Sequence, residues 1–450
     1  MNTTSEKVQC LIVGAGLSGL GCARALQREG IDAHIYESSD DIGGRVRTDN
    51  VDGFILDRGF QVLFTAYPIL QQELDMKALD LQPFDSGALV LWRGEAYPVT
   101  DPFRAPKTFL SALKTGVFSM QDKFALLRLR RLIMGMDITD IFLIPDQNIH
   151  DFLVDNGFTG KFMNNFAQPF YGGIFLSRHL DTSARMFAFT FKMLLEGQAA
   201  VPAHGMMEIP RQIASDIAPG TIHLGCEVES LIREGKAVKG VRFTDGREVF
   251  ADQVVLTVPS GSAAKLTGLQ LPLDRRSTIT AYFEVPVDFN HERAIMLFAE
   301  PNKYAGANSL VNSAVMMSRI SHDYASDGRH LLCVSIIGEP KISDEQILEV
   351  CSREIGNHFP QSKPKEWKIV KIYRIPWAQF TQPAGIFGRL PKADSGISGL
   401  VMGGEILCHS SIQGALEAGQ LSTREVLIRC GKLPKETRRP RRTENMQKPA

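Results

Sequence analysis

Residues 8–19 read Val-Gln-Cys-Leu-Ile-Val-Gly-Ala-Gly-Leu-Ser-Gly, and this stretch decides the fold. An apolar run ends in the glycine-rich turn 14–19, and a pattern typical of a helix follows it. Gly14 permits a tight turn, Gly16 lets the backbone approach a pyrophosphate, and Gly19 lets the helix lie close to the sheet. The N–H groups and the positive dipole end at the start of that helix are suited to bind phosphates.

A second apolar run, Ala33-His34-Ile35-Tyr36, ends in an acid, Glu37. The order strand, glycine turn, helix, strand and acid is that of a dinucleotide-binding βαβ unit. A carboxylate at this place accepts hydrogen bonds from ribose hydroxyls and disfavours a 2′-phosphate. We expect a strand over 8–13 and a helix over about 17–28, and we infer that the chain binds a dinucleotide.

The composition narrows the class of protein. The chain has 450 residues, and its 50 basic and 50 acidic residues give a formal charge of zero, which lends no support to nucleic-acid binding. Seven scattered cysteines, none in a Cys-x-x-Cys pair, argue against a disulfide framework and a zinc site, so we expect no metal. Only seven residues precede the first strand, too few for a targeting peptide, and no stretch is long and apolar enough to span a membrane. We expect a cytoplasmic protein, with peripheral membrane contact as the alternative.

The rest of the chain predicts an α/β fold with two interleaved domains. A Rossmann-like domain with a parallel sheet is expected from 1–75, 205–265 and 392–430, where strands 253–258 and 400–405 and a helix over 412–429 rejoin it. An α+β substrate domain is expected from 76–204 and 266–391, with a helical part at about 105–195 and an antiparallel sheet from strands near 280–285, 294–298, 310–317 and 331–337. The basic tail 431–450 is expected to be disordered.

Residues 124–134, Phe-Ala-Leu-Leu-Arg-Leu-Arg-Arg-Leu-Ile-Met, are both basic and apolar. The simpler interpretation is a core helix with a solvated arginine face. The alternative is a membrane-facing lip over the entrance for a lipophilic substrate.

Several separated stretches together resemble the flavin-containing amine oxidase superfamily, in the branch of protoporphyrinogen oxidases and carotenoid desaturases. The discriminating stretch is Glu37-Ser38-Ser39-Asp40-Asp41-Ile42-Gly43-Gly44-Arg45, because in that superfamily a Gly-Gly-Arg follows the ribose-binding acid. The other matching stretches, in family order, are Asp57-Arg58-Gly59-Phe60, Val201-Pro202-Ala203-His204-Gly205-Met206, Glu227-Val228, Gly403-Gly404-Glu405 and the helix start at 411–419. Taken alone, Gly43-Gly44 could be an ordinary loop, Arg45 a surface charge and Glu405 a helix cap.

The resemblance implies FAD, with Arg45 near its phosphates, Val228 at the adenine, Glu405 at the ribityl chain and the last helix aimed at the pyrimidine edge, where its positive end stabilises anionic reduced flavin. The full set of expected cofactor-binding residues is Gly14, Ala15, Gly16, Leu17, Ser18, Gly19, Glu37, Gly43, Gly44, Arg45, Gly59, Phe60, Val228, Gly404, Glu405 and Ile412. The segment 373–383, where some relatives carry a cysteine that attaches the flavin, has none, so we expect non-covalent FAD. Cys408 is better explained as a small buried apolar residue.

The catalytic residues are less defined. Amine oxidases of the superfamily often carry an aromatic cage with a tyrosine just before the final helix, and Ser410-Ser411 stands there instead. Trp377 is the best candidate for a side chain near the isoalloxazine, with a core tryptophan at the domain junction as the alternative. His409 is a weak acid–base candidate, and Tyr282 and Phe283 either line the substrate side or pack in a strand.

Three functions are open at this point. The first is FAD-dependent oxidation or desaturation of a largely apolar molecule, such as an isoprenoid, carotenoid or porphyrinogen, by hydride transfer to the flavin. The second is an oxygen-dependent amine oxidase, and the third is a flavin-binding protein without turnover. Oxygen or a quinone is the expected electron acceptor, and the sequence leaves the substrate and the oligomeric state open.

Overall fold

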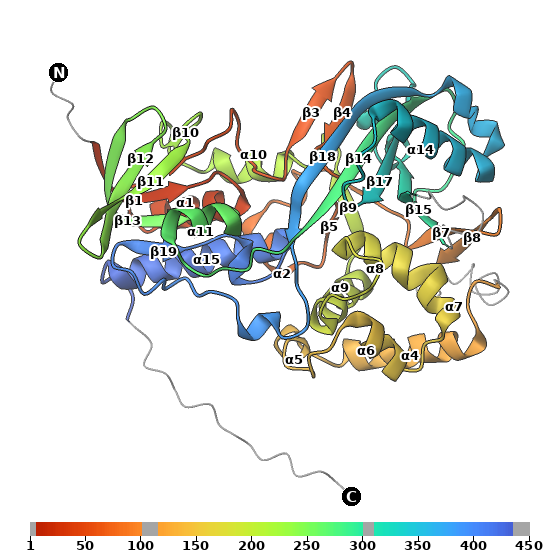
Figure 1. The fold of residues 1–450 in the computed structure, drawn as a ribbon, viewed down its shortest axis with the longest axis horizontal. Helices are drawn as coiled ribbons and strands as arrows, with labels where there is room; N and C mark the ends of the chain where they lie inside the picture. Colours follow the sequence, from red (N-terminus) through yellow and green to blue (C-terminus); the bar gives the residue numbers. More distant parts are fainter. Residues whose placement is uncertain (1–5, 101–115, 300–309, 435–450) are drawn as a thin grey trace, which may run out of the picture.

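The fold is built on two seven-stranded sheets that lie towards opposite ends of the long axis of the molecule, each with helices beside it (Figure 1). The computed structural model describes residues 6–100, 116–299 and 310–434. The α/β fold class with a parallel and an antiparallel sheet is confirmed.

The first sheet carries the dinucleotide fingerprint. Its order is β10–β2–β1–β13–β12–β11, with β19 also on β13. The strands are β1 (Glu6–Val13), β2 (Ala33–Tyr36), β10 (Ile222–His223), β11 (Val228–Glu234), β12 (Ala237–Phe243), β13 (Glu248–Leu256) and β19 (Leu400–Met402). Pairs among β10, β2, β1, β13 and β19 are parallel, whereas β11 and β12 form an antiparallel hairpin. The apolar run of β1 is fully buried, as expected for a strand with both faces covered.

Two helices fix the position of the glycine turn against this sheet. Helix α1 (Leu17–Arg28) follows the turn, and α15 (Ile412–Arg429) packs along α1. A Cβ on Gly419 of α15 would lie 2.8 Å from the Ser18 carbonyl oxygen, so glycine there permits the close approach of the two helices. The observed bounds of α1 and α15 match the ranges predicted from the sequence.

The second sheet has the order β18–β14–β17–β16–β15–β7–β8. The strands are β7 (Gly87–Trp92), β8 (Glu95–Thr100), β14 (Arg275–Val285), β15 (Ile295–Phe298), β16 (Val311–Met316), β17 (His330–Ile337) and β18 (Lys368–Phe380). The expected antiparallel pattern holds except that β15 and β7 are parallel. The exception arises because β7 and β8 come from an early part of the chain and join the edge of the later strands. Helix α14 (Asp344–His358) packs on this sheet.

A helical part lies below the second sheet in Figure 1. It consists of α4 (Met120–Met134), α5 (Ile138–Ile141), α6 (Ile149–Asp155), α7 (Gly160–Phe162), the π-helix Met163–Ala167, α8 (Gln168–Phe175) and α9 (Ala184–Glu196). Helix α4 begins at a capping box in which Ser119 and Asp122 bond each other's backbone N–H. The early part of the predicted helical range, 105–115, lies outside the described residues.

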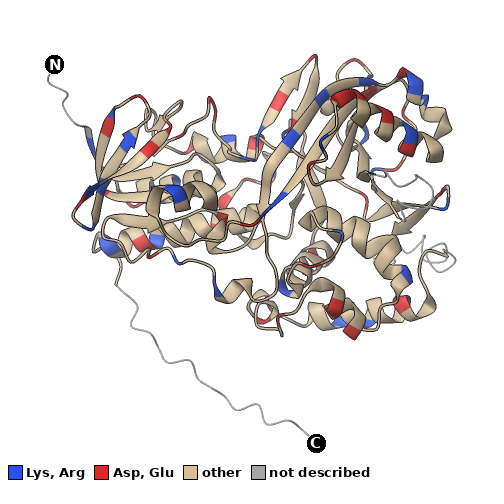
Figure 2. Ribbon diagram, in the orientation of Figure 1, with Lys and Arg blue, Asp and Glu red and all other residues tan. Residues whose placement is uncertain are grey.

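Short elements connect the two sheets. The hairpin β3 (Thr48–Val51)–β4 (Phe54–Asp57) and the sheet β5 (Leu63–Phe64)–β9 (Ala199–Pro202)–β6 (Leu81–Pro83) lie between them. Of the short helices, α2 (Pro68–Glu73) contacts α15, α10 (Glu208–Ser215) contacts α1, α11 (Ser260–Thr267) contacts β11 and α13 (Met317–Ile320) contacts β17. Most of the predicted tail 431–450 lies outside the described residues. Acidic and basic side chains are mixed over both parts (Figure 2). Among the described helices, none has both the length and the apolar character needed to cross a membrane.

Candidate functional site

A cavity of about 1240 Å³ runs between the two sheets and the helical part. Its first end lies at the carboxyl ends of parallel strands, where Val13 ends β1, Tyr36 ends β2 and Thr257 follows β13. Ligands of open α/β sheets bind at this edge. The cavity then continues to α4, α8 and α9. The first end is called the glycine end below, and the part bounded by these helices is called the aromatic end.

The three glycines of the turn have different surroundings, and each position favours glycine for a different reason. Gly14 has φ +103°, and a Cβ on Gly19 would lie 2.0 Å from the Gly14 carbonyl oxygen, so both positions require glycine for backbone reasons. Gly16 differs, because a Cβ there would meet no atom within 4 Å and Gly16 lines the cavity. That open space beside the start of α1 is what a bound diphosphate needs.

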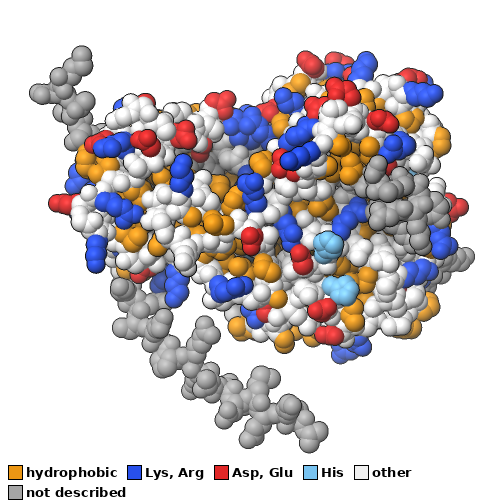
Figure 3. All heavy atoms as spheres, in the orientation of Figure 1, with side chains coloured by type: hydrophobic (Ala, Val, Ile, Leu, Met, Phe, Trp, Pro, Cys, Tyr) orange, Lys and Arg blue, Asp and Glu red, His pale blue; other side chains and the backbone are white. Residues whose placement is uncertain are grey.

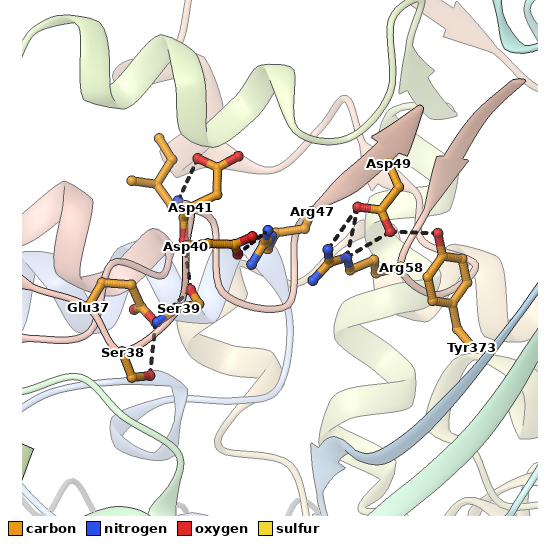
Figure 4. A network of polar contacts seen from close by, with 10 residues as sticks. Glu37, Ser38, Ser39, Asp40, Asp41, Arg47, Asp49, Arg58 and Tyr373 are labelled. Atoms are coloured by element: carbon orange, nitrogen blue, oxygen red, sulfur yellow. Dashed lines mark hydrogen bonds and ion pairs between the residues drawn. The ribbon is translucent and has the colours of Figure 1, made fainter. Parts of the chain in front are cut away.

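Glu37 lies at the same end with its carboxylate fixed by local donors. One oxygen accepts the backbone N–H of Ala15 at 2.7 Å. The other accepts the N–H of Ser39 at 2.9 Å and the hydroxyls of Ser38 and Ser39 (Figure 4). A carboxylate has about four acceptor positions, so the Ala15-bonded oxygen retains capacity for a ligand hydroxyl. Glu37 is buried yet lines the cavity, which suits a ribose contact.

The Gly-Gly-Arg stretch lies directly against the glycine turn. The N–H of Gly43 donates to the Ala15 carbonyl at 2.8 Å, and a Cβ on Gly44 would lie 3.2 Å from Gly16 Cα. Arg45 points across the cavity to the C-terminal motif, where its guanidinium lies 2.8 Å from the Glu405 carboxylate and 2.8 Å from the Ala378 carbonyl oxygen. The two charged residues that the resemblance assigns to different parts of FAD are therefore paired with each other.

The turn after β4 is held by a buried carboxylate. Asp57 accepts the hydroxyls of Thr48 and Tyr324, each at 2.6 Å, and the backbone N–H of Met206 at 2.8 Å. Burial raises the pKa of Asp57, against the hydrogen bonds that act to lower it. Gly59, with φ +114°, then turns the chain into the cavity.

Arg58 forms the other end of the polar network in Figure 4. Its guanidinium binds Asp49 through Nε and Nη2, at 2.8–3.1 Å, and the Tyr373 hydroxyl donates to Asp49 at 2.7 Å. Partial burial acts to raise the pKa of Asp49, but the hydrogen bonds from Arg58 and Tyr373 lower it. The contact joins the β3–β4 hairpin to β18 of the second sheet.

Most of the predicted cofactor residues meet at the glycine end. Those that line the cavity are Gly14, Gly16, Leu17, Ser18, Glu37, Gly43, Gly44, Arg45, Gly59, Phe60, Val228, Gly404, Glu405 and Ile412. Ala15 and Gly19 are not among its described lining residues. They act through the backbone, Ala15 by donating to Glu37 and Gly19 by letting α1 pack on the turn.

Neither of the two catalytic candidates, Trp377 and His409, is among the described residues that line the cavity. Trp377 packs its ring against Gly261, with the Arg275 guanidinium 5.7 Å from the ring centre, while its neighbours Ile375, Ala378 and Gln379 on β18 line the cavity. His409 is buried between Phe142 and Phe189. Tyr282 and Phe283 are also packed in the interior, where the Tyr282 hydroxyl donates to the Asp57 carbonyl.

Thr257, Gln61 and Tyr67 are among the lining residues that the sequence analysis did not single out. The single hydroxyl proton of Thr257 is shared between the carbonyl oxygens of Val13 and Gly14, and the sequence offered a signal, since Thr257 lies near the end of the predicted parallel strand 253–258. Gln61 donates to the Arg45 carbonyl at 2.8 Å. Tyr67 comes from the N-terminus of α2, a position that only the tertiary structure brings to the cavity.

The aromatic end has a different chemistry. Its wall is formed mainly by Phe118, Phe158, Phe162, Phe166, Phe170, Tyr171, Phe187 and Phe191, with further Leu, Ile and Met side chains. Ring centres of Phe166 and Phe170 lie 5.0 Å apart in a stacked arrangement. Among the described residues no cluster of His, Cys, Asp and Glu could hold a metal ion.

Comparison with known proteins agrees with this geometry. Residues 17–427 match the family described as flavin containing amine oxidoreductase. Coproporphyrinogen III oxidase of Bacillus subtilis (strain 168) is 20% identical over 399 residues, covering 78% of this chain and 81% of the relative. The 15-cis-phytoene desaturase of Synechococcus elongatus is 22% identical over 472 residues, covering 95% and 97%.

Solved structures show the same fold. An oxidoreductase from Methanosarcina mazei superposes with a TM-score of 0.69 at 17% identity, covering 93% of this chain and 99% of that one. Putrescine oxidase bound to putrescine gives a TM-score of 0.66 at 16% identity, covering 94% and 99%. With a family match over most of its length and a cavity that gathers the family's motifs, the chain belongs to the flavin containing amine oxidoreductase family and is a flavin-dependent oxidoreductase.

Proposed function

We propose that the chain binds FAD non-covalently at the glycine end and uses it to oxidise a largely apolar small molecule at the aromatic end. When bound, FAD supplies the redox chemistry by accepting a hydride equivalent, and the protein supplies position and electrostatics. The turn 14–19 and Arg45 would hold the diphosphate, Glu37 the ribose, Val228 the adenine and Glu405 the ribityl chain. The open space at Gly16 supports this assignment.

The observation that carries the substrate class is the continuity of the cavity. One space joins the glycine end to the phenylalanine-lined aromatic end, so an apolar substrate bound there can reach the cofactor. One relative that covers 78% of the chain is named for a porphyrinogen and one that covers 95% is named for phytoene, and both compounds are large and rich in carbon. We therefore propose an isoprenoid, carotenoid or porphyrinogen as substrate, with oxygen or a quinone as electron acceptor.

An amine substrate is the second candidate, since putrescine oxidase shares the fold. The serines at 410–411 in place of a cage tyrosine, and the apolar wall, count against it. A flavin-binding protein without turnover is the third.

Anaerobic reduction of the bound flavin separates the three. Holoprotein is mixed with porphyrinogens, polyenes and amines, and bleaching of the flavin absorbance is followed. We expect bleaching by a polyene or porphyrinogen. Bleaching by amines alone would establish the second function, and photoreduction without response to any compound would establish the third. Release of free FAD on denaturation is expected, and flavin that stays with the chain would refute non-covalent binding.

The aromatic end also opens beside an apolar surface row on α4. Met120, Phe124 and Leu127 are 56%, 66% and 46% exposed, and all three line the cavity as well. Isolated hydrophobic side chains are common on the face seen in Figure 3, so exposure alone is no argument. A row that is exposed, lines the cavity and is flanked by Arg128 and Arg131 fits peripheral contact with an anionic bilayer that delivers the substrate.

Vesicle sedimentation tests this contact. We expect binding to vesicles that contain phosphatidylserine, and about tenfold weaker binding for Leu127→Glu. Leu421→Glu on α15 is the matched control, because Leu421 is 40% exposed and lies outside the cavity wall. Equal binding of both variants and the wild type would exclude α4 as the contact.

A further inference from the structure

The start of α15 is held in place by three linked side chains, Tyr67, Ser411 and His409, to which the proposed function assigns no role. Ser411 is the N-cap residue, and its hydroxyl accepts the Gly414 N–H at 2.9 Å. The same oxygen lies 2.9 Å from His409 Nδ1. Burial raises the pKa of Tyr67, and a hydrogen bond donated by the Ser411 hydroxyl acts to lower it. A serine hydroxyl has one proton and two lone pairs, so these three partners satisfy it completely.

Both ends of this chain are locked by packing. The His409 ring is 3% exposed, stacks on Phe142 with centres 5.8 Å apart, and contacts Phe189 at 5.0 Å. Burial lowers the pKa of His409 to about 4, so the imidazole is neutral at pH 7. The Tyr67 ring stacks on the other side of the network against the same Phe189, at 5.9 Å. Phe189 therefore holds both terminal rings at once.

The chain controls a surface that faces the cavity. Tyr67, Ser411 and Ile412 all line it. Ser411 and its backbone satisfy the N–H groups of Gly414 and Ala415, whereas those of Ile412 and Gln413 have no acceptor among the described residues. A Cβ on Gly414 would lie 2.1 Å from the His409 carbonyl oxygen, so the turn 409–414 is too tight to shift freely. Gln413 adds a second attachment to α2 by accepting the Ile69 N–H at 3.1 Å.

We propose that Tyr67, Ser411 and His409 act as a positioning chain that holds the free amides at the start of α15, and the Tyr67 ring beside them, against the reactive end of the flavin. This rests on the proposed FAD site. Free amides and the positive helix end favour negative charge, so their placement stabilises the reduced, anionic cofactor relative to the oxidised one. His409 and Ser411 touch neither substrate nor reacting atoms in this role.

The variants of Tyr67, His409 and Ser411 distinguish the effect of ring packing from the effect of the hydrogen bonds. Tyr67→Phe keeps the stacked ring and removes its hydroxyl. His409→Phe keeps an aromatic ring and removes the Nδ1 contact, whereas His409→Asn keeps a polar atom near the place of Nδ1. Ser411→Ala removes the centre of the chain. Ser343→Ala is the matched control, because Ser343 is the N-cap of α14, far from the cavity, and bonds the Gln346 N–H in the same way.

Two measurements are made on each protein. Hydrogen exchange of peptides covering 409–416 is followed with and without FAD, and the flavin midpoint potential is measured in the holoprotein. We expect Ser411→Ala and His409→Phe to speed exchange about tenfold and to weaken the preference for reduced flavin about fivefold, ~20 mV for a two-electron couple. Tyr67→Phe should give the same direction, His409→Asn should restore most of the loss, and Ser343→Ala should leave both readouts unchanged.

Unchanged exchange and potential in Ser411→Ala and His409→Phe would overturn the proposal. Faster exchange with an unchanged potential would also overturn it, since the chain would then be structural only. The exchange measured without FAD does not depend on the cofactor, so a chain that binds no FAD would refute the proposed function and leave this readout intact.

Discussion

The two ends of the cavity are built by opposite means. At the glycine end, backbone groups and short side chains do the work, and substitution of Gly14, Gly19 or Gly43 would force a clash or a strained φ. At the aromatic end, large side chains from α4, α7, the π-helix 163–167, α8 and α9 surround the space. Backbone geometry tolerates little change, whereas an apolar wall of the right volume tolerates much. The difference teaches that cofactor identity is fixed by the first end and substrate identity is adjustable at the second.

Substitution of Gly16 is expected to have the largest effect on the glycine end. Gly16→Val places three carbons in the space assigned to the diphosphate, so we expect FAD affinity to fall a thousandfold or more, about 4 kcal/mol. Gly21→Ala in the same helix is the control, because its Cβ would make only an ordinary contact, 3.5 Å from Leu416. Flavin content of the purified proteins is measured by absorbance, and full occupancy in Gly16→Val would sink the βαβ assignment.

His409 is buried just before the start of α15, and its burial makes the free energy of unfolding depend on pH. The unfolded chain takes up a proton near pH 6.5, but burial lowers the pKa of His409 to about 4 in the folded protein. Above pH 6.5 the histidine is neutral in both states and this group costs no stability. As the pH falls towards 4, only the unfolded chain takes up the proton, so the free energy of unfolding decreases by about 3 kcal/mol. Urea unfolding at several pH values should show a shallower acid loss in His409→Phe than in the wild type. Parallel curves would contradict it.

Glu37 tests how far the glycine end depends on a side chain. Glu37→Ala removes the ribose acceptor and leaves the Ala15 N–H without its partner, so we expect FAD binding to weaken about thirtyfold, ~2 kcal/mol. Asp40→Ala, which removes only an exposed partner of Arg47, should bind FAD normally. Titration calorimetry of the apoproteins decides between them, and equal affinities would remove Glu37 from the site.

Phe170 tests the tolerance of the aromatic end. Phe170→Ala enlarges the wall without touching the glycine end, so we expect unchanged flavin content and about tenfold slower flavin reduction by the substrate, ~1.4 kcal/mol. Phe170→Leu should recover most of the rate. A loss of flavin from Phe170→Ala would show that the two ends are not independent.

Local chemistry explains why much of the glycine end was predictable. The roles of Gly14, Gly16 and Gly19 follow from short-range backbone geometry, and Glu37 follows β2 at a fixed spacing. The Arg45–Glu405 pair was out of reach, because it joins residues 360 positions apart that the motifs assign separately. The place of Trp377 was also out of reach, because the pairing of β18 with β14 shifts register between Gln379 and Ile375, so simple alternation does not tell which side chains meet the cavity.

By itself, the sequence determined that a dinucleotide site forms, because a tight turn, a close backbone approach and an acceptor for ribose each require particular residues at fixed spacing. Its resemblance to the flavin-containing amine oxidase superfamily then implied that the dinucleotide is a flavin. Only the tertiary structure decided which side chains surround the reactive end. Tyr67, Ser411 and His409 come from two distant segments, and they meet because α2 and α15 pack together through Phe189 and Gln413. Such contacts depend on the volume and shape of a whole core rather than on any local pattern.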